Sequence, residues 1–215
     1  MTLVKICGIT NLDDARSAIE AGADMLGFNF YRPSPRFIEP SEARKIIESL
    51  QAGPNNQSNK MVGVFVNEAS PAAVMKIVDA AGVNAVQLHG DESTEFCGTL
   101  KAHLDARWLI KVLRVTESFV PPNVQPYAAD AVMLDAFHGA LRGGTGQVFD
   151  WTVARAARDF VLRLFLAGGL SPENVGQAIA QVDPYAVDAC SSLESAPGRK
   201  DSERVMAFVQ AVRNR

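Results

Sequence analysis

Two side chains that can exchange protons stand at the ends of short apolar runs in this sequence. Cys7 closes the run 3–7, and Asp135 closes the run 131–135. A cysteine accepts protons only as the thiolate, and its ordinary thiol pKa is about 8.5, whereas a protonated carboxyl donates. A free cysteine is also a common buried apolar residue, and a carboxylate in a core must be paired. The two residues therefore indicate general acid–base catalysis, with burial of Cys7 and pairing of Asp135 as the alternatives.

Four further polar residues share this placement in apolar runs: Lys5, Gln87, His89 and Asp188. Side chains alternate between the two faces of a strand, so Lys5 shares a face with Cys7. Gln87 shares a face with His89 for the same reason. A protonated Lys5 would favour the thiolate and lower the pKa of its neighbour. We interpret all four as substrate-contacting candidates. An interior histidine with satisfied hydrogen bonds and an aspartate paired with a cation are the alternatives.

Arg36 lies in a proline-rich segment, RPSPRFIEP, at residues 32–40. Its planar guanidinium can clamp a carboxylate or stack on an aromatic ring. The neighbouring prolines stiffen the segment that presents it. Arg36 is therefore a candidate for binding the substrate, and a solvated loop arginine is the alternative.

Glycines and serines gather in three segments that follow the later apolar runs. Glycine lets backbone N–H groups approach a phosphate closely. Tight turns alone would explain any one segment, but three segments together favour a phosphate site. The residues of this prediction are Gly143, Gly144, Gly146, Gly168, Gly169, Ser191 and Ser192.

Eight short apolar runs alternate with amphipathic stretches along the chain. The predicted strands are residues 3–7, 25–30, 61–67, 85–89, 108–114, 131–135, 163–167 and 186–189, and the predicted helices are about 12–23, 41–51, 70–81, 92–104, 151–159, 172–181 and 202–214. The predicted helix N-caps are Asn11, Ser41 and Ser70, and the predicted first helical residues are Pro71 and Pro172. The segment 116–127 after the fifth strand contains three prolines, so its helix is expected to be short or degenerate.

This alternation predicts an α/β fold, a single (β/α)₈ TIM barrel that spans residues 1–215 as one catalytic domain. An open doubly wound sheet is the alternative, but no GxGxxG follows the first strand. Barrel enzymes place their working groups at the C-terminal ends of the strands, where the polar residues of this chain recur. Loops seven and eight of such barrels commonly hold phosphate, as the glycine and serine segments predict here.

Composition narrows the classes of partner. The formal net charge of −3 argues against a general nucleic-acid binder, which normally carries a strong basic excess. No apolar run reaches the roughly 18 residues of a membrane span, and the first residues lack a signal peptide's arrangement. Cys7, Cys97 and Cys190 give an odd count without CxxC spacing, which fits neither a disulfide framework nor a zinc site. We expect a cytoplasmic enzyme with a small phosphorylated substrate, and no nucleic acid, membrane or metal partner.

These motifs together resemble those of a known family, phosphoribosylanthranilate isomerase. The matching motifs are KICGIT at 5–10, GFNFYRPSPR at 27–36, QLHG at 87–90, LDAF at 134–137, GGTGQVFDW at 143–151, LAGGLSPENV at 166–175 and the region 188–194. They follow in order through essentially the whole chain.

The resemblance implies an isomerase of tryptophan biosynthesis that needs no cofactor. Such an enzyme converts N-(5′-phosphoribosyl)anthranilate to 1-(2-carboxyphenylamino)-1-deoxyribulose 5-phosphate by an Amadori rearrangement. Carried onto matching positions, the resemblance makes Cys7 the general base and Asp135 the general acid. It places Arg36 against the anthranilate group, and adds Thr145 of GGTG to the phosphate site.

One segment departs from the family pattern. The strand-eight motif commonly reads DVSSGVE, whereas this chain has Cys190 in place of the first serine and Ser192 in place of the glycine. A serine N–H still donates to phosphate if the backbone needs no left-handed conformation. We assign the Cys190 thiol no chemistry from the sequence.

The sequence leaves two alternative functions open. One is another sugar-phosphate barrel isomerase, and the other is a barrel that binds a sugar phosphate without turnover. The related isomerase of histidine biosynthesis is expected to use two aspartates, so Cys7 disfavours it. The assembly is expected to be a monomer or a homodimer.

Overall fold

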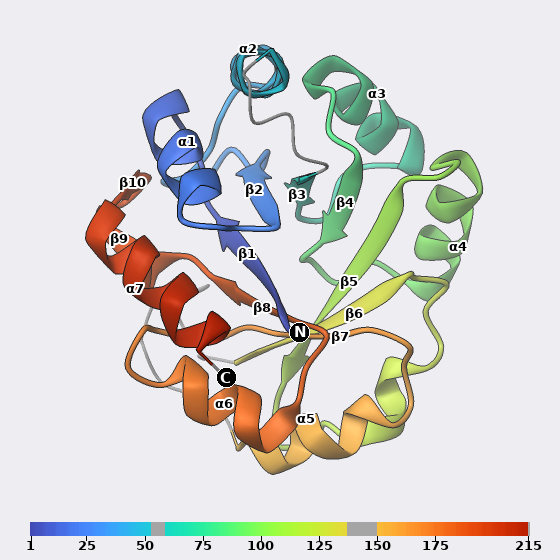
Figure 1. Ribbon diagram of the computed structural model, residues 1–215. Helices are drawn as coiled ribbons and strands as arrows, with labels where there is room; N and C mark the ends of the chain where they lie inside the picture. The colour runs from blue at the N-terminus through green and yellow to red at the C-terminus, as the bar shows by residue number, and fades with distance from the viewer. Residues whose placement is uncertain (53–58, 137–149, 215) are drawn as a thin grey trace.

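A closed barrel of eight parallel strands, numbered in chain order, forms the centre of the computed structural model (Figure 1). The structure describes residues 1–52, 59–136 and 150–214. The strands are β1 (Leu3–Cys7), β2 (Met25–Asn29), β3 (Lys60–Phe65), β4 (Ala85–Leu88), β5 (Trp108–Val115), β6 (Ala131–Ala136), β7 (Leu164–Leu166) and β8 (Ala186–Ala189). The predicted (β/α)₈ barrel is therefore confirmed, and the open sheet is excluded.

Helices surround the barrel in the order that the alternating pattern predicts (Figure 1). They are α1 (Leu12–Glu20), α2 (Pro40–Gln51), α3 (Pro71–Ala81), α4 (Thr94–His103), α5 (Trp151–Arg158), α6 (Val175–Val182) and α7 (Ser202–Arg213). A short 3₁₀ helix, η1 (Pro121–Val124), follows β5. Proline lacks the N–H that a helix interior needs, which explains the short helix expected there.

Two apolar regions hold the fold together. Residues such as Val4, Ile6 and Leu88 belong to a large cluster between the strands and the surrounding helices. A smaller cluster, which includes Met25 and Phe165, fills the inside of the barrel. Odd and even positions of each strand therefore face different sides, as expected from the alternation of side chains. This alternation places Lys5, Gln87 and Asp188 inside the barrel wall, where all are buried.

Closure of the barrel brings β1 beside β8. The two strands pair in parallel with Lys5 opposite Asp188 and Ile6 opposite Ala189. Residues that are opposite in a parallel pair point to the same side of the sheet. The inward side chains of the first and last strands therefore lie side by side. This seam carries much of the candidate site.

Helix starts agree with the sequence at some positions and differ at others. Asn11 and Ser70 cap α1 and α3, with side-chain oxygens that accept from backbone N–H groups at 2.9 and 3.2 Å. Pro71 opens α3 as expected. The prediction for Ser41 was wrong, because Pro40 opens α2 and Ser41 lies inside the helix.

The prediction that Pro172 begins a helix was also wrong, because α6 starts at Val175. The Asn174 side chain accepts from the Ser171 N–H at 2.9 Å and donates to the Gly169 carbonyl at 2.9 Å. These bonds hold the residues before α6 in a turn, where an amide side chain substitutes for helical bonds.

A small addition follows β8 that the sequence pattern did not predict. It consists of the 3₁₀ helix η2 (Ser191–Leu193) and the antiparallel strands β9 (Glu194–Ala196) and β10 (Arg199–Lys200). Gly198 joins the two strands with a φ of 77°, a left-handed conformation that favours glycine. Within the described residues, no helix has both the length and the hydropathy to span a bilayer.

Candidate active site

Cys7, Lys5 and Asp188 form a buried polar cluster across the β1–β8 seam. Lys5 is fully buried, and its Nζ donates to Asp188 Oδ1 at 2.7 Å. The Cys7 thiol lies one layer nearer to the ends of the strands, and both it and Lys5 Nζ lie close to Gly27. Cys7 itself is 8% exposed, so the thiol lies at the edge of the buried region rather than deep within it.

The electrostatics of this cluster favour a thiolate. A hydrogen bond from Cys190 and the nearby ammonium groups of Lys5 and Lys200 lower the pKa of Cys7, against the opposing effect of burial. Burial alone would lower the pKa of Lys5, but Asp188 and Cys7 outweigh it and raise this pKa. Burial raises the pKa of Asp188 to about 6, so this carboxyl is ionised at neutral pH. The lysine thus stays charged between two anions.

Asp135 lies at the end of β6 in a second polar chain. Its Oδ2 is 3.1 Å from His89 Nε2, and His89 Nδ1 is 3.2 Å from the side-chain nitrogen of Gln87. The amide N–H of Gln87 donates to Nδ1 of His89, so Nδ1 is the acceptor. The imidazole proton is therefore on Nε2, which donates to Asp135. Gln87 is fully buried beneath His89. The chain therefore fixes the imidazole and leaves Asp135 partly exposed.

Two glycines let the backbone and side chains of the site pack closely. A Cβ at Gly27 would lie 2.8 Å from Cys7 Sγ and 3.1 Å from Lys5 Nζ. A Cβ at Gly168 would lie 2.3 Å from the Ala136 nitrogen and 2.9 Å from Asp135 Oδ1, and its φ is 85°. Such distances exclude larger residues unless the neighbouring side chains or backbone move.

Part of the predicted phosphate site lies within the described residues. Gly168 and Gly169 follow β7 with φ values of 85° and 69°, and Ser191 and Ser192 form the start of η2 after β8. Among the described residues, the N–H groups of Gly169, Ser191 and Ser192 donate to no protein acceptor. The remaining residues of this prediction, Gly143, Gly144, Thr145 and Gly146, lie outside the described residues.

Arg36 is held by a partner that the sequence did not reveal. Its Nε and Nη2 donate to the two carboxylate oxygens of Glu194 at 2.7–3.1 Å. Lys200 Nζ donates to the same carboxylate at 2.9 Å. Burial alone would raise the pKa of Glu194, but these cations outweigh it and lower the pKa. Since 158 positions separate Arg36 from Glu194, no local pattern could have indicated this pair.

Cys190 lies within this same group rather than in a remote loop. Its thiol is 3.9 Å from Glu194 Oε1 and 3.8 Å from Lys200 Nζ, and the nearby Cys7 raises its pKa. A Cβ at Gly8 would lie 2.9 Å both from Cys190 Sγ and from Arg36 Cδ. No feature of the sequence indicated that Cys190 lies beside Cys7, because the two cysteines are near opposite ends of the chain.

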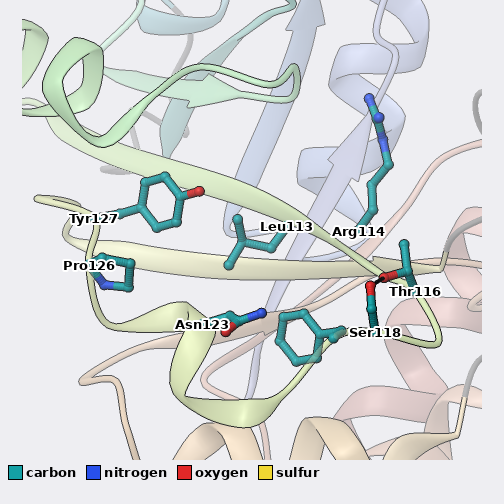
Figure 2. Close-up of a pocket in the computed structure, with 8 residues that line it drawn as sticks. Leu113, Arg114, Thr116, Ser118, Asn123, Pro126 and Tyr127 are labelled. Carbon is teal, nitrogen blue, oxygen red and sulfur yellow. Dashed lines mark hydrogen bonds between the residues drawn. The ribbon is translucent and has the colours of Figure 1, made fainter.

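Two surface pockets lie within the described residues, and Arg114, which lines the first, donates to the His89 carbonyl at 3.5 Å. One, of about 310 Å³, lies between β5 and η1 and is lined in part by Arg114, Phe119 and Tyr127 (Figure 2). The other, of about 570 Å³, lies between α1 and α2. No predicted site residue lines either pocket. In the part of the chain that the structure describes, no group of three or more His, Cys, Asp or Glu residues is placed to hold a metal ion.

Comparison with known proteins agrees with this arrangement. The model of the N-(5′-phosphoribosyl)anthranilate isomerase family matches residues 4–211. The chain belongs to this family. A relative from Trichlorobacter lovleyi, N-(5′-phosphoribosyl)anthranilate isomerase, is 45% identical over 210 residues, which are 98% of this chain and 97% of the relative.

Solved structures of phosphoribosylanthranilate isomerases have the same fold. Monomers generated from the dimeric enzyme of Thermotoga maritima match with a TM-score of 0.83 and 35% identity over 100% of both chains. A phosphoribosylanthranilate isomerase in complex with reduced 1-(o-carboxyphenylamino)-1-deoxyribulose 5-phosphate matches with a TM-score of 0.83 and 37% identity, again over 100% of both chains. The chain therefore acts as a phosphoribosylanthranilate isomerase, an enzyme of tryptophan biosynthesis, and the two alternative functions are excluded.

Proposed function

We propose that Cys7 is the general base and Asp135 the general acid with which this isomerase performs the Amadori rearrangement. The observation that carries the proposal is the position of the Cys7 thiol near the buried Lys5, which is itself paired with Asp188 at 2.7 Å. The lowered pKa of this thiol increases the fraction that is present as the nucleophilic and basic thiolate. Among the described residues, Asp135 is the partly exposed carboxyl at the end of a strand that can supply the complementary proton.

The first step opens the furanose ring of N-(5′-phosphoribosyl)anthranilate. The protonated carboxyl of Asp135 gives its proton to the ring oxygen as the bond from this oxygen to C1′ breaks. The lone pair of the anthranilate nitrogen forms a C1′=N bond, which gives a cationic Schiff base. His89 donates to Oδ2 and so holds the carboxyl of Asp135 in one orientation. Oδ1 takes no part in this hydrogen bond.

The second step removes the proton from C2′. The Cys7 thiolate takes this proton, and the electron pair of the C–H bond forms a C1′=C2′ double bond while the Schiff base nitrogen becomes neutral. The resulting enolamine gains a proton at C1′ and loses one from the 2′-hydroxyl to give the ketone. Each proton transfer by a positioned group typically accelerates a reaction by about 10²–10⁴-fold.

The remaining site residues position the substrate or the catalytic groups. Arg36 is proposed to bind the carboxylate of the anthranilate group, since a guanidinium matches this geometry. His89 and Asp188 are proposed to contact the sugar. The fully buried Lys5 and Gln87 are proposed to act through Cys7 and His89.

The phosphate is proposed to bind at the loops after β6, β7 and β8. The residues of this part of the proposal are Gly143, Gly144, Thr145, Gly146, Gly168, Gly169, Ser191 and Ser192. The N–H groups after β7 and β8 that lack an acceptor among the described residues support it, because anions bind readily where several such donors converge.

The fluorescence of phosphoribosylanthranilate, which falls as the substrate is consumed, tests these roles. We expect rapid decay with the wild-type protein. Cys7→Ser and Asp135→Asn should each lower kcat by about 10²–10⁴-fold while substrate still binds. Near-wild-type turnover in either variant would overturn the assignment of that residue.

The wider context of the enzyme is also part of the proposal. Residues 1–215 are proposed to act as one catalytic domain, as a monomer or a homodimer that light scattering distinguishes. A cytoplasmic location is proposed because Cys7 must stay reduced to act as a base, and this compartment keeps thiols reduced.

A further inference from the structure

Cys7 and Cys190 form a pair of adjacent thiols that the proposed mechanism does not use as a pair. Strands β1 and β8 are in register through Ile6 and Ala189. Cys7 is the next residue of β1, and Cys190 directly follows the end of β8. Neighbouring strands lie about 4.8 Å apart, and disulfides commonly join Cα atoms that are roughly 4.4–6.8 Å apart. Both cysteines are free, and each affects the pKa of the other.

The close packing around the two sulfur atoms keeps them together. Gly27 lies against Cys7 Sγ, where a Cβ would approach to 2.8 Å, and Gly8 lies against Cys190 Sγ, where a Cβ would approach to 2.9 Å. Neither thiol therefore has free space on the side of these glycines. Cys190 is half-buried and Cys7 lies at the edge of the buried region, so a small solute can reach the pair from the end of the strands.

The charges around the pair make one thiol reactive and keep the other protonated. Lys200 Nζ lies 3.8 Å from Cys190 Sγ, and Lys200 and Lys5 both lower the pKa of Cys7. The hydrogen bond with Cys7, together with burial, holds the pKa of Cys190 well above its ordinary value. A reactive thiolate next to a second, resolving thiol is the arrangement that redox-sensitive cysteines share.

We propose that hydroperoxides oxidise Cys7 and Cys190 to a disulfide that reversibly switches the isomerase off. The Cys7 thiolate attacks a peroxide oxygen, the O–O bond breaks, and sulfenic acid and hydroxide form. The Cys190 thiol gives its proton to this hydroxide, which becomes water. The resulting Cys190 thiolate attacks the sulfur of the sulfenic acid, an S–S bond forms, and hydroxide leaves. The two thiols lose two electrons in total, and the peroxide gains them. The loss of activity rests on the proposed role of Cys7 as the base, whereas the disulfide does not.

Peptide mapping under non-reducing conditions, with activity measured in parallel, tests the proposal. Trypsin places Cys7 in the peptide 6–16 and Cys190 in the peptide 164–199. After treatment of the wild-type protein with hydrogen peroxide, we expect these two peptides to be linked. Activity should fall in proportion to the linked fraction, and dithiothreitol should restore it. Absence of the linked pair would overturn the proposal.

Two variants separate this disulfide from general damage. Cys190→Ser lacks the resolving thiol, so its Cys7 should proceed to sulfinic acid, and dithiothreitol should not restore activity. Recovery of this variant as complete as that of the wild type would contradict the proposal. Cys97→Ala, which removes a buried thiol of α4, should respond like the wild type. Linked peptides in a protein that keeps full activity would support the disulfide and overturn Cys7 as the base.

Discussion

At the scale of single residues, the site depends on buried charges that compensate one another. Lys5 is fully buried, yet it stays charged because Asp188, 2.7 Å away, and the nearby Cys7 raise its pKa. Burial of an unpaired charge costs several kcal/mol, so each member of such a group depends on the others. The reactivity of Cys7 is therefore a property of the group rather than of the thiol alone.

Lys5→Met tests this dependence through the pH profile of kcat/KM. The ammonium group lowers the pKa of Cys7, so its removal should raise this pKa. Activity that depends on the thiolate appears as pH rises through the pKa, and the rise should therefore move to higher pH. Unchanged titration of the Cys7 thiolate absorbance would contradict this expectation.

Lys111→Met is a matched control, since Lys111 is equally buried and pairs with Glu92 at 2.6 Å outside the barrel interior. Both variants leave a buried carboxylate without its cation, which typically lowers the free energy of unfolding by about 3–5 kcal/mol. Only Lys5→Met should change the pH profile, so urea denaturation and kinetics together separate stability from catalysis.

Arg36→Met tests the binding of the anthranilate carboxylate. A hydrogen bond to a charged group contributes about 1.5–3 kcal/mol, so KM should rise roughly 10- to 100-fold while kcat changes less. Arg32→Met is the control, because Arg32 lies in the same segment with a 74% exposed side chain that pairs with Glu39. A similar KM for both variants would show that Arg36 serves only to hold Glu194.

At the scale of elements, the strands and the segments that follow them determine how closely the candidate catalytic side chains pack against their neighbours. Gly27 of β2 faces the thiol and ammonium groups of β1, and Gly168 after β7 faces the end of β6. The hairpin of β9 and β10 supplies Glu194 and Lys200 to the same end of the barrel. Small residues and short additions at the ends of strands therefore shape the site as much as the reactive groups do.

Gly27→Ala should lower kcat while the protein remains folded. Its Cβ would lie 2.8 Å from Cys7 Sγ and 3.1 Å from Lys5 Nζ, so these side chains must move, and a misplacement of about 1 Å can cost roughly 10²-fold in rate. Gly98→Ala in α4, where a Cβ would meet nothing within 4 Å, should keep full activity. It should also raise the free energy of unfolding by about 0.5–1 kcal/mol. Steady-state kinetics and urea denaturation of both variants measure the difference.

At the scale of the whole molecule, the ends of the chain meet at the closure of the barrel (Figure 1). Arg213 at the end of α7 donates to the Thr2 and Gly22 carbonyls at 2.9 Å and to Asp24 at 2.7 Å. Asp24 in turn accepts from the Val4 N–H of β1 at 2.7 Å. The last helix is thus hydrogen-bonded to residues beside the first strand, on the outside of the barrel.

Arg213→Ala should lower the free energy of unfolding without changing kcat. Loss of hydrogen bonds from a charged group costs about 1.5–3 kcal/mol, and none of the partners belongs to the candidate site. Arg204→Ala, which changes an exposed arginine of the same helix, should stay within about 0.5 kcal/mol of the wild type. Equal stability of the two variants in urea would show that the hydrogen bonds of Arg213 do not stabilise the fold.

The sequence by itself determined the strands and the barrel, and it predicted the candidate site residues. The alternation of side chains along a strand is local, so residue spacing alone assigns Lys5 and Cys7 to one shared face, and Gln87 and His89 to another. Motifs at strand ends indicated the family as well. The predictions for Ser41 and Pro172 failed because turn chemistry shifts a helix start by a few residues.

Only the tertiary structure decided which distant residues became partners. Lys5 meets Asp188 across 183 positions, and Arg36 meets Glu194 across 158. Cys190, to which the sequence assigned no chemistry, lies beside Cys7 because the register of β1 and β8 aligns them. Such pairs depend on how the barrel closes and on the backbone after β8, and neither is encoded in a local pattern of residues.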